Sequence, residues 1–356
     1  MKLMINIPDL RNKGGVAQYY KVLNLNEEPG IQYFSINNYG KNIFIRLIKT
    51  FISFSGKISK FDAICINPSL DKKSFYRDAV FAFLARIRRK KLIVFWHGWE
   101  NEFESKIHNS KKLQLIFKNS FGKAQGVIVL SKIFKEKLIA LGMSPDMRCH
   151  LETMSVNTEW IKRFCINEKN QSDSSDRFNI LFLSRIIKEK GVYTFVDASK
   201  IFSEKYPDRK IMFHIAGNGD ELDNLKDYVD RNKIKNVIFH GDVRGEIKYN
   251  LLVNSHLFFF PTEYGEGFPN VIIEALFFGL PVISRPVGAI SEIIENGKNG
   301  YVDSTNKAID FIKYIEPLII NKDKLIEMSY ECHTAARLKY SSDTVRKKTI
   351  EFYQTF

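Results

Sequence analysis

The sequence predicts an α/β fold made of two domains, each a parallel sheet covered by helices. Short apolar runs such as Leu92–Phe95 and Leu257–Phe260 are typical of strands buried on both faces. Segments with helical periodicity alternate with these runs. A chain of 356 residues with 44% hydrophobic residues is long enough for two cores. We place the domains at residues 1–168 and 169–338, followed by a C-terminal helical segment at 339–356.

Positive charge is concentrated in the first half of the chain. Residues 1–170 hold 29 Lys and Arg against 14 Asp and Glu, whereas the remainder holds 25 against 26. This asymmetry indicates an anionic partner, either nucleic acid or an anionic membrane surface; a solvated basic face without a partner is the alternative. The polar segment from Asn167 to Arg177 lies where the balance changes and is predicted as the linker.

Targeting, membrane-spanning and disulfide signals are weak. No apolar run approaches the roughly 18 to 20 residues of a spanning helix, and Asp9 and Arg11 interrupt any signal-peptide core. The four cysteines lie far apart without a C-x-x-C pair, which indicates neither a disulfide framework nor a zinc site. We therefore expect a soluble, cytoplasmic chain.

The first domain begins with a strand at Lys2–Ile7 and a loop that contains Gly14 and Gly15. The glycines allow the backbone to approach a ligand closely, although Gly-Gly is also common in simple turns. The segment from Ile43 to Phe54 predicts an amphipathic helix. Either the helix packs on the sheet, or part of its apolar face enters a bilayer interface.

A helix predicted from Phe75 to Ala85 is followed by a run of cations. Cations complement the dipole at a helix C-terminus, but five charges in six residues exceed what a cap needs. Near an anionic leaflet each could contribute about 1 kcal/mol. The predicted membrane-binding or acceptor-binding residues are Arg86, Arg88, Arg89, Lys90 and Lys91.

A histidine follows the buried strand Leu92–Phe95. His97 lies at the carboxyl end of this strand beside a glycine, where ligands of α/β sheets bind, so we interpret it as a site residue. Trp96 and Trp99 on either side belong to the core or flank the acceptor; the sequence leaves both alternatives open.

The second domain repeats the pattern from the strand Asn179–Leu183. Arg185 and Lys190 lie in the next loop, before a helix predicted at Val192–Phe202. Arg offers a planar fork for phosphate and Lys a point charge, although two cations in a loop are a weak motif by themselves.

A loop rich in Gly and Pro follows the strand Leu257–Phe260, and Asn270 is predicted to cap the next helix, which Gly279 ends. Free amides at the helix start favour a diphosphate. Glu266 in the loop and Glu274 about one turn into the helix can accept hydrogen bonds from paired hydroxyls of one ligand. Alternatively, both are solvated surface groups.

This region resembles the E-x7-E signature of the retaining family 4 glycosyltransferases. The resemblance implies the GT-B fold, in which two Rossmann-like domains face each other across a cleft, and it is strongest from Asn179 to Val302. It also implies that the tail from Ser342 to Phe356 crosses back onto the N-terminal domain. The matching residues are Glu266 to Asn270, Glu274, Ala275, Gly279 to Ile283, Gly288 and Glu292.

The resemblance also implies roles for individual residues. Glu266 would contact hydroxyls of the donor sugar and Glu274 those of the ribose, while His97 would lie near the donor phosphate and the transferred sugar. Arg185 and Lys190 match an R-x4-K-G element that binds the diphosphate. The expected catalytic residues are Glu266 and His97, and the expected donor-binding residues are Gly15, Arg185, Lys190, Gly217, Gly241, Val243, Gly267, Phe268, Pro269, Asn270 and Glu274.

The implied reaction moves a hexosyl group from a UDP- or GDP-sugar to a glycan acceptor with retention at the anomeric carbon. No Asp-x-Asp element occurs, so we expect neither a metal nor another cofactor. The basic first domain suggests a polyprenyl-diphosphate-linked acceptor at the inner face of the cell membrane, as in the assembly of surface polysaccharides such as lipopolysaccharide. The alternatives are a GT-B sugar-nucleotide epimerase and a basic nucleic-acid-binding protein, for which no recognition motif is present.

Overall fold

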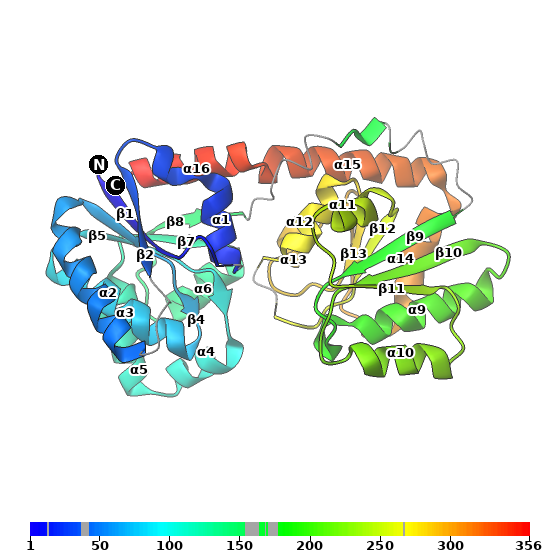
Figure 1. The fold of residues 1–356 in the computed structure, drawn as a ribbon, viewed down its shortest axis with the longest axis horizontal. Coiled ribbons are helices and arrows are strands. Elements are labelled where there is room, and N and C mark those ends of the chain that lie inside the picture. Colours follow the sequence, from blue (N-terminus) through cyan, green and yellow to red (C-terminus); the bar gives the residue numbers. More distant parts are fainter. Residues whose placement is uncertain (13, 37–42, 154–163, 168, 170–176, 266–267) are drawn as a thin grey trace. The chain divides into compact units, whose positions relative to one another are not determined.

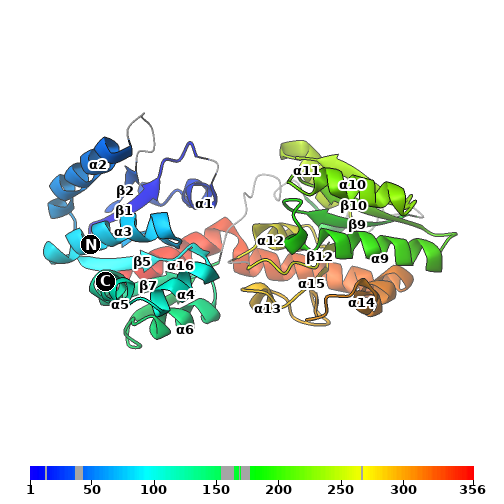
Figure 2. The same ribbon diagram turned by 90° about the horizontal axis from the view of Figure 1, so that it is seen from below.

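The computed structural model describes residues 1–12, 14–36, 43–153, 164–167, 169, 177–265 and 268–356. The chain forms two compact units, one comprising Met1–Ser155 with Ser342–Phe356 and the other Val156–Ser341 (Figures 1 and 2). The boundaries predicted from the sequence were 168/169 and 338/339, and most of the predicted linker lies outside the described residues.

The first unit contains a six-stranded parallel sheet in the order β2-β1-β3-β5-β7-β8. Its strands are mostly buried and apolar, as expected for a sheet with helices on both faces. The strands are β1 Leu3–Pro8, β2 Ile31–Ile36, β3 Ala63–Ile66, β5 Lys91–Phe95, β7 Gly126–Val129 and β8 Arg148–Leu151, with a two-stranded pair of β4 Ser69–Leu70 and β6 Gly98–Trp99.

Helices surround this sheet, and α3, α5 and α6 each begin with a side-chain cap. The side chain of Asp71 accepts hydrogen bonds from the amides of Lys73 and Ser74, and the hydroxyl of Ser131 accepts from the amide of Phe134. The helices are α1 Gly15–Leu23, α2 Ile43–Lys57, α3 Lys72–Ile87, α4 Asn101–His108, α5 Lys111–Asn119, α6 Lys132–Ala140 and α16 Ser342–Gln354, with 3-10 turns at Leu25–Glu27, Ile58–Lys60 and Phe121–Lys123.

The C-terminal helix α16 packs within the first unit against α1. The buried carboxylate of Glu152, just after β8, accepts a hydrogen bond from Tyr19 of α1 at 2.9 Å and another from Thr349 of α16. The guanidinium of Arg346 donates to the carbonyl of Leu23 at 3.0 Å. These contacts tie the last helix to the first strand–helix unit.

The second unit contains another six-stranded parallel sheet, in the order β11-β10-β9-β12-β13-β14. The strands are β9 Arg177–Leu183, β10 Lys210–Ala216, β11 Val237–Gly241, β12 Leu257–Phe260, β13 Val282–Ser284 and β14 Gly300–Val302. The helices are α9 Val192–Lys205, α10 Leu222–Arg231, α11 Gly245–Val253, α12 Asn270–Phe277, α13 Ile290–Ile293, α14 Ala308–Ile320 and α15 Lys322–Tyr340, with a 3-10 turn at Lys188–Lys190.

The strand order reverses between β9 and β12, which are direct neighbours. From β9 the chain proceeds to β10 and β11 on one side, and from β12 to β13 and β14 on the other. In open parallel sheets, ligands bind at such a switch point, outside the carboxyl ends of the strands. The loops predicted to bind the donor follow β9 and β12 and therefore emerge side by side at this point.

Two local features differ from expectation or resolve an alternative. The N-cap of α12 is Pro269, with extended backbone (φ −78°, ψ 103°), so Asn270 is the first helical residue and the prediction of Asn270 as N-cap was wrong. Trp96 is fully buried and belongs to the core of the first unit.

Gly279 ends α12 with φ +67°, as predicted. Within the described part of the chain, no helix is long and apolar enough to cross a membrane.

Candidate functional site

Backbone hydrogen bonds join the loops at the switch point of the second unit. The carbonyl of Glu189, in the loop after β9, accepts from the amides of Glu263 and Tyr264, in the loop after β12, at 2.7 and 2.9 Å. On the other side, the amide of Ile186 donates to the carbonyl of Asn218, in the loop after β10, at 3.0 Å. These bonds hold three loops in a fixed arrangement before any ligand binds.

Two of the glycines permit this close contact between loops. A Cβ atom on Gly217, whose φ is +144°, would lie 1.8 Å from the carbonyl oxygen of Ser184. A Cβ atom on Gly191 would lie 2.0 Å from the carbonyl oxygen of Pro261. Any other residue would push the loops apart. Gly217, predicted to bind the donor, therefore has a structural requirement of its own.

Two predicted phosphate-binding cations lie over the same aromatic ring. Lys190 is buried, with 6% of its surface exposed, and its Nζ lies 4.2 Å from the centre of the Tyr264 ring. Arg185 is exposed, and its Cζ lies 5.5 Å from the same centre. Cations within about 6 Å of a ring face are attracted by its quadrupole. Tyr264 thus gathers both positive charges at the carboxyl ends of β9 and β12.

The predicted ribose-binding residue, Glu274, forms an ion pair. Its Oε2 lies 2.5 Å from Nζ of Lys248 on α11, and both side chains are largely buried. Its neighbour on the previous turn, Asn270, has a buried Oδ1 without a hydrogen-bond partner among the described residues. A carboxylate and an amide oxygen therefore both lie within the first turns of α12 and can accept hydrogen bonds from hydroxyl groups.

Of the remaining residues of the second unit predicted to contact the donor, the structure describes four and leaves two undescribed. Gly241 ends β11 with φ +69°, and its carbonyl accepts from the amide of Gly217 at 2.7 Å. Val243 is buried in the core of the second unit. Phe268 packs near Tyr340, and Pro269 is buried. Glu266 and Gly267 lie outside the described residues, so their predicted roles stay predictions.

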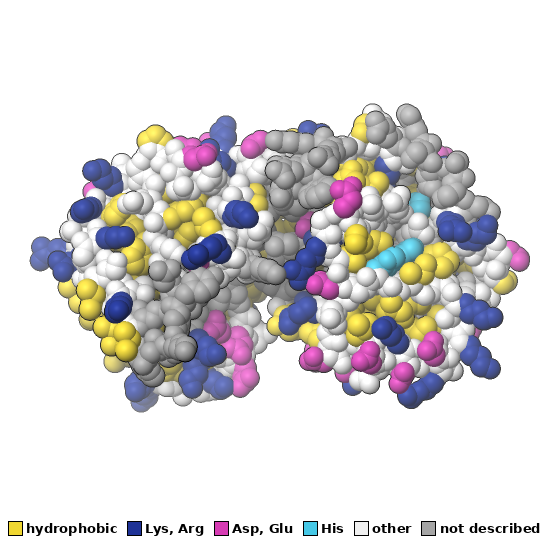
Figure 3. Space-filling model, viewed as in Figure 1, with side chains coloured by type: hydrophobic (Ala, Val, Ile, Leu, Met, Phe, Trp, Pro, Cys, Tyr) yellow, Lys and Arg dark blue, Asp and Glu magenta, His cyan; other side chains and the backbone are white. Residues whose placement is uncertain are grey.

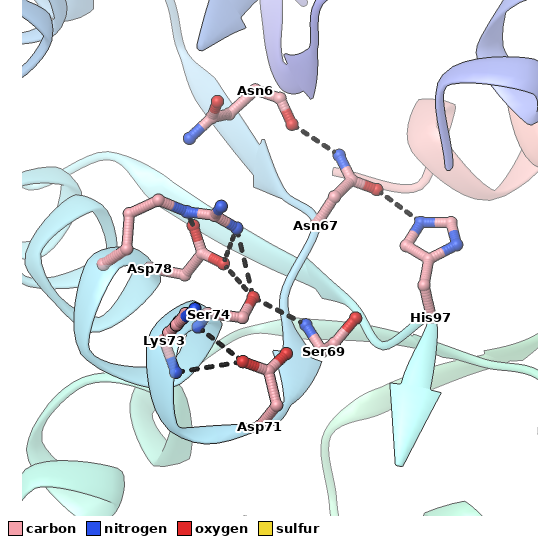
Figure 4. Close-up of polar contacts among 9 residues, drawn as sticks. Asn6, Asn67, Ser69, Asp71, Lys73, Ser74, Asp78 and His97 are labelled. Atoms are coloured by element: carbon pink, nitrogen blue, oxygen red, sulfur yellow. Dashed lines mark hydrogen bonds and ion pairs between the residues drawn. The ribbon is translucent and has the colours of Figure 1, made fainter. Parts of the chain in front are cut away.

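In the first unit, His97 belongs to a polar chain at the carboxyl ends of β1, β3 and β5 (Figure 4). Asn67, directly after β3, donates from Nδ2 to the carbonyl of Asn6 at 2.7 Å. Its Oδ1 lies 2.8 Å from Nε2 of His97 and accepts from the hydroxyl of Tyr20 at 2.7 Å. The side-chain amide of Asn6 is buried and makes no hydrogen bond to the described residues.

Burial and the contact with Asn67 together indicate the protonation state of His97. Burial lowers the pKa of His97 from 6.5 to about 3, so its ring is neutral at neutral pH. Because Nδ2 of Asn67 is engaged as a donor, its Oδ1 must accept from His97, which places the imidazole proton on Nε2. The other ring nitrogen, Nδ1, then carries a lone pair that can accept a hydrogen bond.

The loop after β1 has no steric need for its glycines. Gly14 is the N-cap of α1 without a side-chain hydrogen bond, and Gly15 is the first helical residue. A Cβ atom on either would meet no atom within 4 Å. The open space beside both residues is compatible with the predicted approach of a ligand to Gly15.

The basic run from Arg86 to Lys91 lies at the amino-terminal ends of the strands, whereas His97 lies at their carboxyl ends. Lys91 is the first residue of β5, whereas His97 follows the end of the same strand. Arg88 and Arg89 are exposed where α3 ends. A pocket of about 220 Å³ is lined by Arg86, Arg89, Lys90, Lys91, Leu92, Lys123 and Gln125. The structure therefore does not bring the predicted basic cluster to His97.

Sequence reasoning missed Tyr264, Lys248 and Asn67. Two signals were available, because Asn67 directly follows a buried strand and Tyr264 stands beside a glycine in the loop after another. No local signal marks Lys248, whose partner is 26 positions away in the sequence. Among the residues that the structure describes, no group of three or more His, Cys, Asp or Glu side chains is arranged to hold a metal ion.

Comparison with known proteins agrees with this architecture. Residues 166–338 match the family model of the glycosyl transferases group 1. The chain is similar to the crystal structure of Anabaena Alr3699/HepE in complex with UDP, with a TM-score of 0.77, 16% identity and 100% coverage of both chains. Structural neighbours of this kind define the fold as GT-B, as predicted.

Two of the proteins that resemble the chain come from Staphylococcus aureus and Klebsiella pneumoniae. The chain is 26% identical over 231 residues to the capsular polysaccharide biosynthesis glycosyltransferase CapM of Staphylococcus aureus. The aligned residues cover 64% of the chain and 58% of CapM. It is 23% identical over 323 residues to an uncharacterized 41.2 kDa protein in the cps region of Klebsiella pneumoniae, covering 88% and 83%. The chain spans 45% to 66% of the length of CapM and of three uncharacterized glycosyltransferases that it also matches.

Proposed function

We propose that the chain is a retaining, family 4 glycosyltransferase that moves a hexosyl group from a UDP- or GDP-sugar to a glycan acceptor. The observation that carries the proposal is the pair of cations, Arg185 and Lys190, held over Tyr264 at the switch point of the second sheet. This is the position at which a parallel α/β sheet binds an anionic ligand. The match of residues 166–338 to the glycosyl transferases group 1 supports the same assignment.

Negative charge develops on the nucleotide diphosphate as the bond to the sugar breaks. The buried ammonium of Lys190 and the guanidinium of Arg185 would stabilise that charge, helped by the amides at the start of α12. Because loops joined by hydrogen bonds already position both cations, little reorganisation accompanies the reaction. With these charges in place we propose a mechanism that needs no metal ion or other cofactor.

The carboxylate of Glu274 would accept hydrogen bonds from the ribose hydroxyls. Lys248 holds this carboxylate in place through its ion pair at 2.5 Å. In the first unit, neutral His97 would accept a hydrogen bond from a sugar hydroxyl through Nδ1, while Asn67 fixes its ring. We assign orientation of the donor sugar to Glu266. We do not assign it the role of a covalent nucleophile.

The acceptor is inferred from charge and from the relatives. The first half of the chain carries the positive excess, which suits an anionic, polyprenyl-diphosphate-linked glycan. CapM is described by its role in capsular polysaccharide biosynthesis, which supports a growing surface glycan as acceptor. The complex of HepE with UDP favours UDP as the nucleotide. We propose that the protein works at the inner face of the cell membrane.

Ligand-dependent melting tests the donor site. Wild type and Glu274→Ala are melted with UDP, GDP, ADP and their sugars, and a ligand at 100 times its dissociation constant should add about 2.7 kcal/mol of stability. Glu246→Ala is the matched control, because Glu246 is an exposed glutamate on α11. We expect one nucleotide to raise the melting temperature of wild type and of the control, and to raise that of Glu274→Ala much less. Equal shifts in all three proteins, or no shift with any nucleotide, would contradict the proposal.

A further inference from the structure

The helix α3 exposes a continuous apolar stripe. Tyr76, Val80, Phe83 and Ile87 follow one another at spacings of four, three and four residues, which places them on one helical face. All four are exposed, Ile87 by 58%. The opposite face is also apolar and packs on the sheet through Phe75 and Phe81. The exposed stripe is thus additional to the core-facing side of the helix.

The neighbouring helix α2 has a second stripe of the same kind. Ile45, Ile48 and Ile52 are exposed, Ile52 by 67%, whereas Phe54 on the other side is fully buried. The two helices pack together, because the rings of Phe51 and Phe54 each lie 4.7 Å from the ring of Phe81. Figures 1 and 2 show α2 and α3 side by side, and Figure 3 shows hydrophobic side chains along that margin of the unit.

The charges around these stripes are mostly positive, although the partly exposed Asp71 caps the start of α3. The sequence of α2 contains no Asp or Glu, and the one carboxylate of α3, Asp78, is buried and paired with Arg77. Cations stand at both ends of the α3 stripe and along α2: Lys72, Lys73, Arg86, Arg88, Arg89, Lys49 and Lys57. The exposed surface of the two helices is therefore apolar along its length and basic at its ends.

We propose that the exposed face of α2 and α3 docks on an anionic lipid bilayer. Apolar side chains would enter the interface between headgroups and acyl chains, while Arg and Lys contact anionic headgroups. A second copy of the chain suits this face less well. A two-fold interface apposes the same patch of both copies and would place the exposed cations of one copy against those of the other. The inference rests on the proposed function, because it gives the transferase a way to reach a lipid-linked acceptor.

Flotation of the full-length protein with vesicles tests the proposal. The vesicles contain phosphatidylcholine alone or phosphatidylcholine mixed with phosphatidylglycerol. The apolar variant combines Ile52→Ser, Phe83→Ser and Ile87→Ser. Its matched control replaces three exposed side chains of the second unit, through Ile247→Ser, Ile309→Ser and Leu338→Ser.

A second pair of variants tests the charges. Arg88→Ser with Arg89→Ser removes two exposed cations at the end of α3, and Lys226→Ser with Lys235→Ser removes two exposed cations of the second unit. We expect wild type and both controls to float with anionic vesicles. The partition coefficient of each α2–α3 variant should fall by about tenfold or more, as the loss of two headgroup contacts or three buried side chains implies.

Three results would overturn the proposal. The first is no flotation of wild type, and the second is equal loss in variants and controls. The third is self-association of the wild type without lipid, measured as a dimer mass by light scattering, that only the apolar variant abolishes. The exposed face of α2 and α3 would then join two copies of the chain. Melting with nucleotide separates this inference from the proposed function. Flotation without nucleotide binding would contradict the proposed glycosyltransferase function and support the membrane-docking face. Nucleotide binding without flotation would support the proposed function and contradict the membrane-docking face.

Discussion

Replacement of Lys190 by methionine is the most informative single change at the donor site. Methionine keeps an unbranched side chain of similar length, so it can fill the space that the buried lysine occupies, but it removes the charge 4.2 Å from the Tyr264 ring. The protein should still fold. The lost cation–π attraction, about 0.5–2 kcal/mol, is offset because an ammonium no longer has to be buried.

The effect on nucleotide affinity follows from the contact that Lys190 would make with the diphosphate. A hydrogen bond to a charged group contributes about 1.5–3 kcal/mol. At about 1.4 kcal/mol per factor of ten, the dissociation constant for UDP or GDP should rise about 10- to 150-fold. Isothermal titration of both nucleotides against wild type and Lys190→Met measures this change directly.

Lys188→Met is the matched control. Lys188 lies in the same 3-10 turn, but its side chain is 69% exposed and pairs with Glu221 at 3.8 Å. An exposed ion pair contributes about 0–1 kcal/mol, so this variant should bind nucleotide like wild type. Two results would exclude a diphosphate contact by Lys190: equal losses of affinity in the two variants, or wild-type affinity in Lys190→Met with unchanged melting.

Three further predictions concern stability, measured by urea unfolding. Gly217→Ala should destabilise the protein by about 1–3 kcal/mol or more, because its Cβ would lie 1.8 Å from a carbonyl oxygen, whereas Gly56→Ala in α2 meets no atom within 4 Å and should not. Since the folded pKa of His97 is about 3 and its ordinary value 6.5, the unfolded state binds the proton first, and stability is lost as the pH falls between these values. His97→Asn should therefore show a shallower loss from pH 6.5 to 4.5, by up to about 1.4 kcal/mol per pH unit; an unchanged slope would contradict the assigned burial. Asn67→Leu should cost about 2 kcal/mol or more, because the hydroxyl of Tyr20 and Nε2 of His97 both lose their acceptor; a cost below about 0.5 kcal/mol would exclude that network.

Local patterns in the sequence predict most of the fold. Fully apolar runs such as Leu257–Phe260 mark strands of a parallel sheet because both of their faces are buried. Ser131 and Gly279 mark a helix start and a helix end because their side-chain and backbone chemistry acts within a few residues. The cap of α12 was missed by one residue, since Pro269 already supplies the extended backbone that an N-cap needs.

Contacts between distant residues could not be predicted. Lys248 reaches Glu274, and Asn67 reaches His97, only once strands and helices have packed, so no local pattern records either pair. The stripe on α3 was missed for a different reason. This helix is apolar on its exposed and its buried side, so periodicity alone cannot tell which side the sheet covers. The predicted site residues themselves, Glu266 among them, stay predictions until ligand binding is measured.

Sugar transfer by the purified protein is the direct test of the proposed glycosyltransferase activity. Nucleotide-sugars labelled in the hexose are incubated with a membrane lipid extract and wild type, Lys190→Met or Lys188→Met, and label is followed into the lipid-linked fraction. We expect incorporation from one UDP- or GDP-sugar, retention at the anomeric carbon of the product, and loss of incorporation with Lys190→Met but not with Lys188→Met. Label that stays on the nucleotide as an epimer, or incorporation that Lys190→Met leaves unchanged, would contradict this expectation.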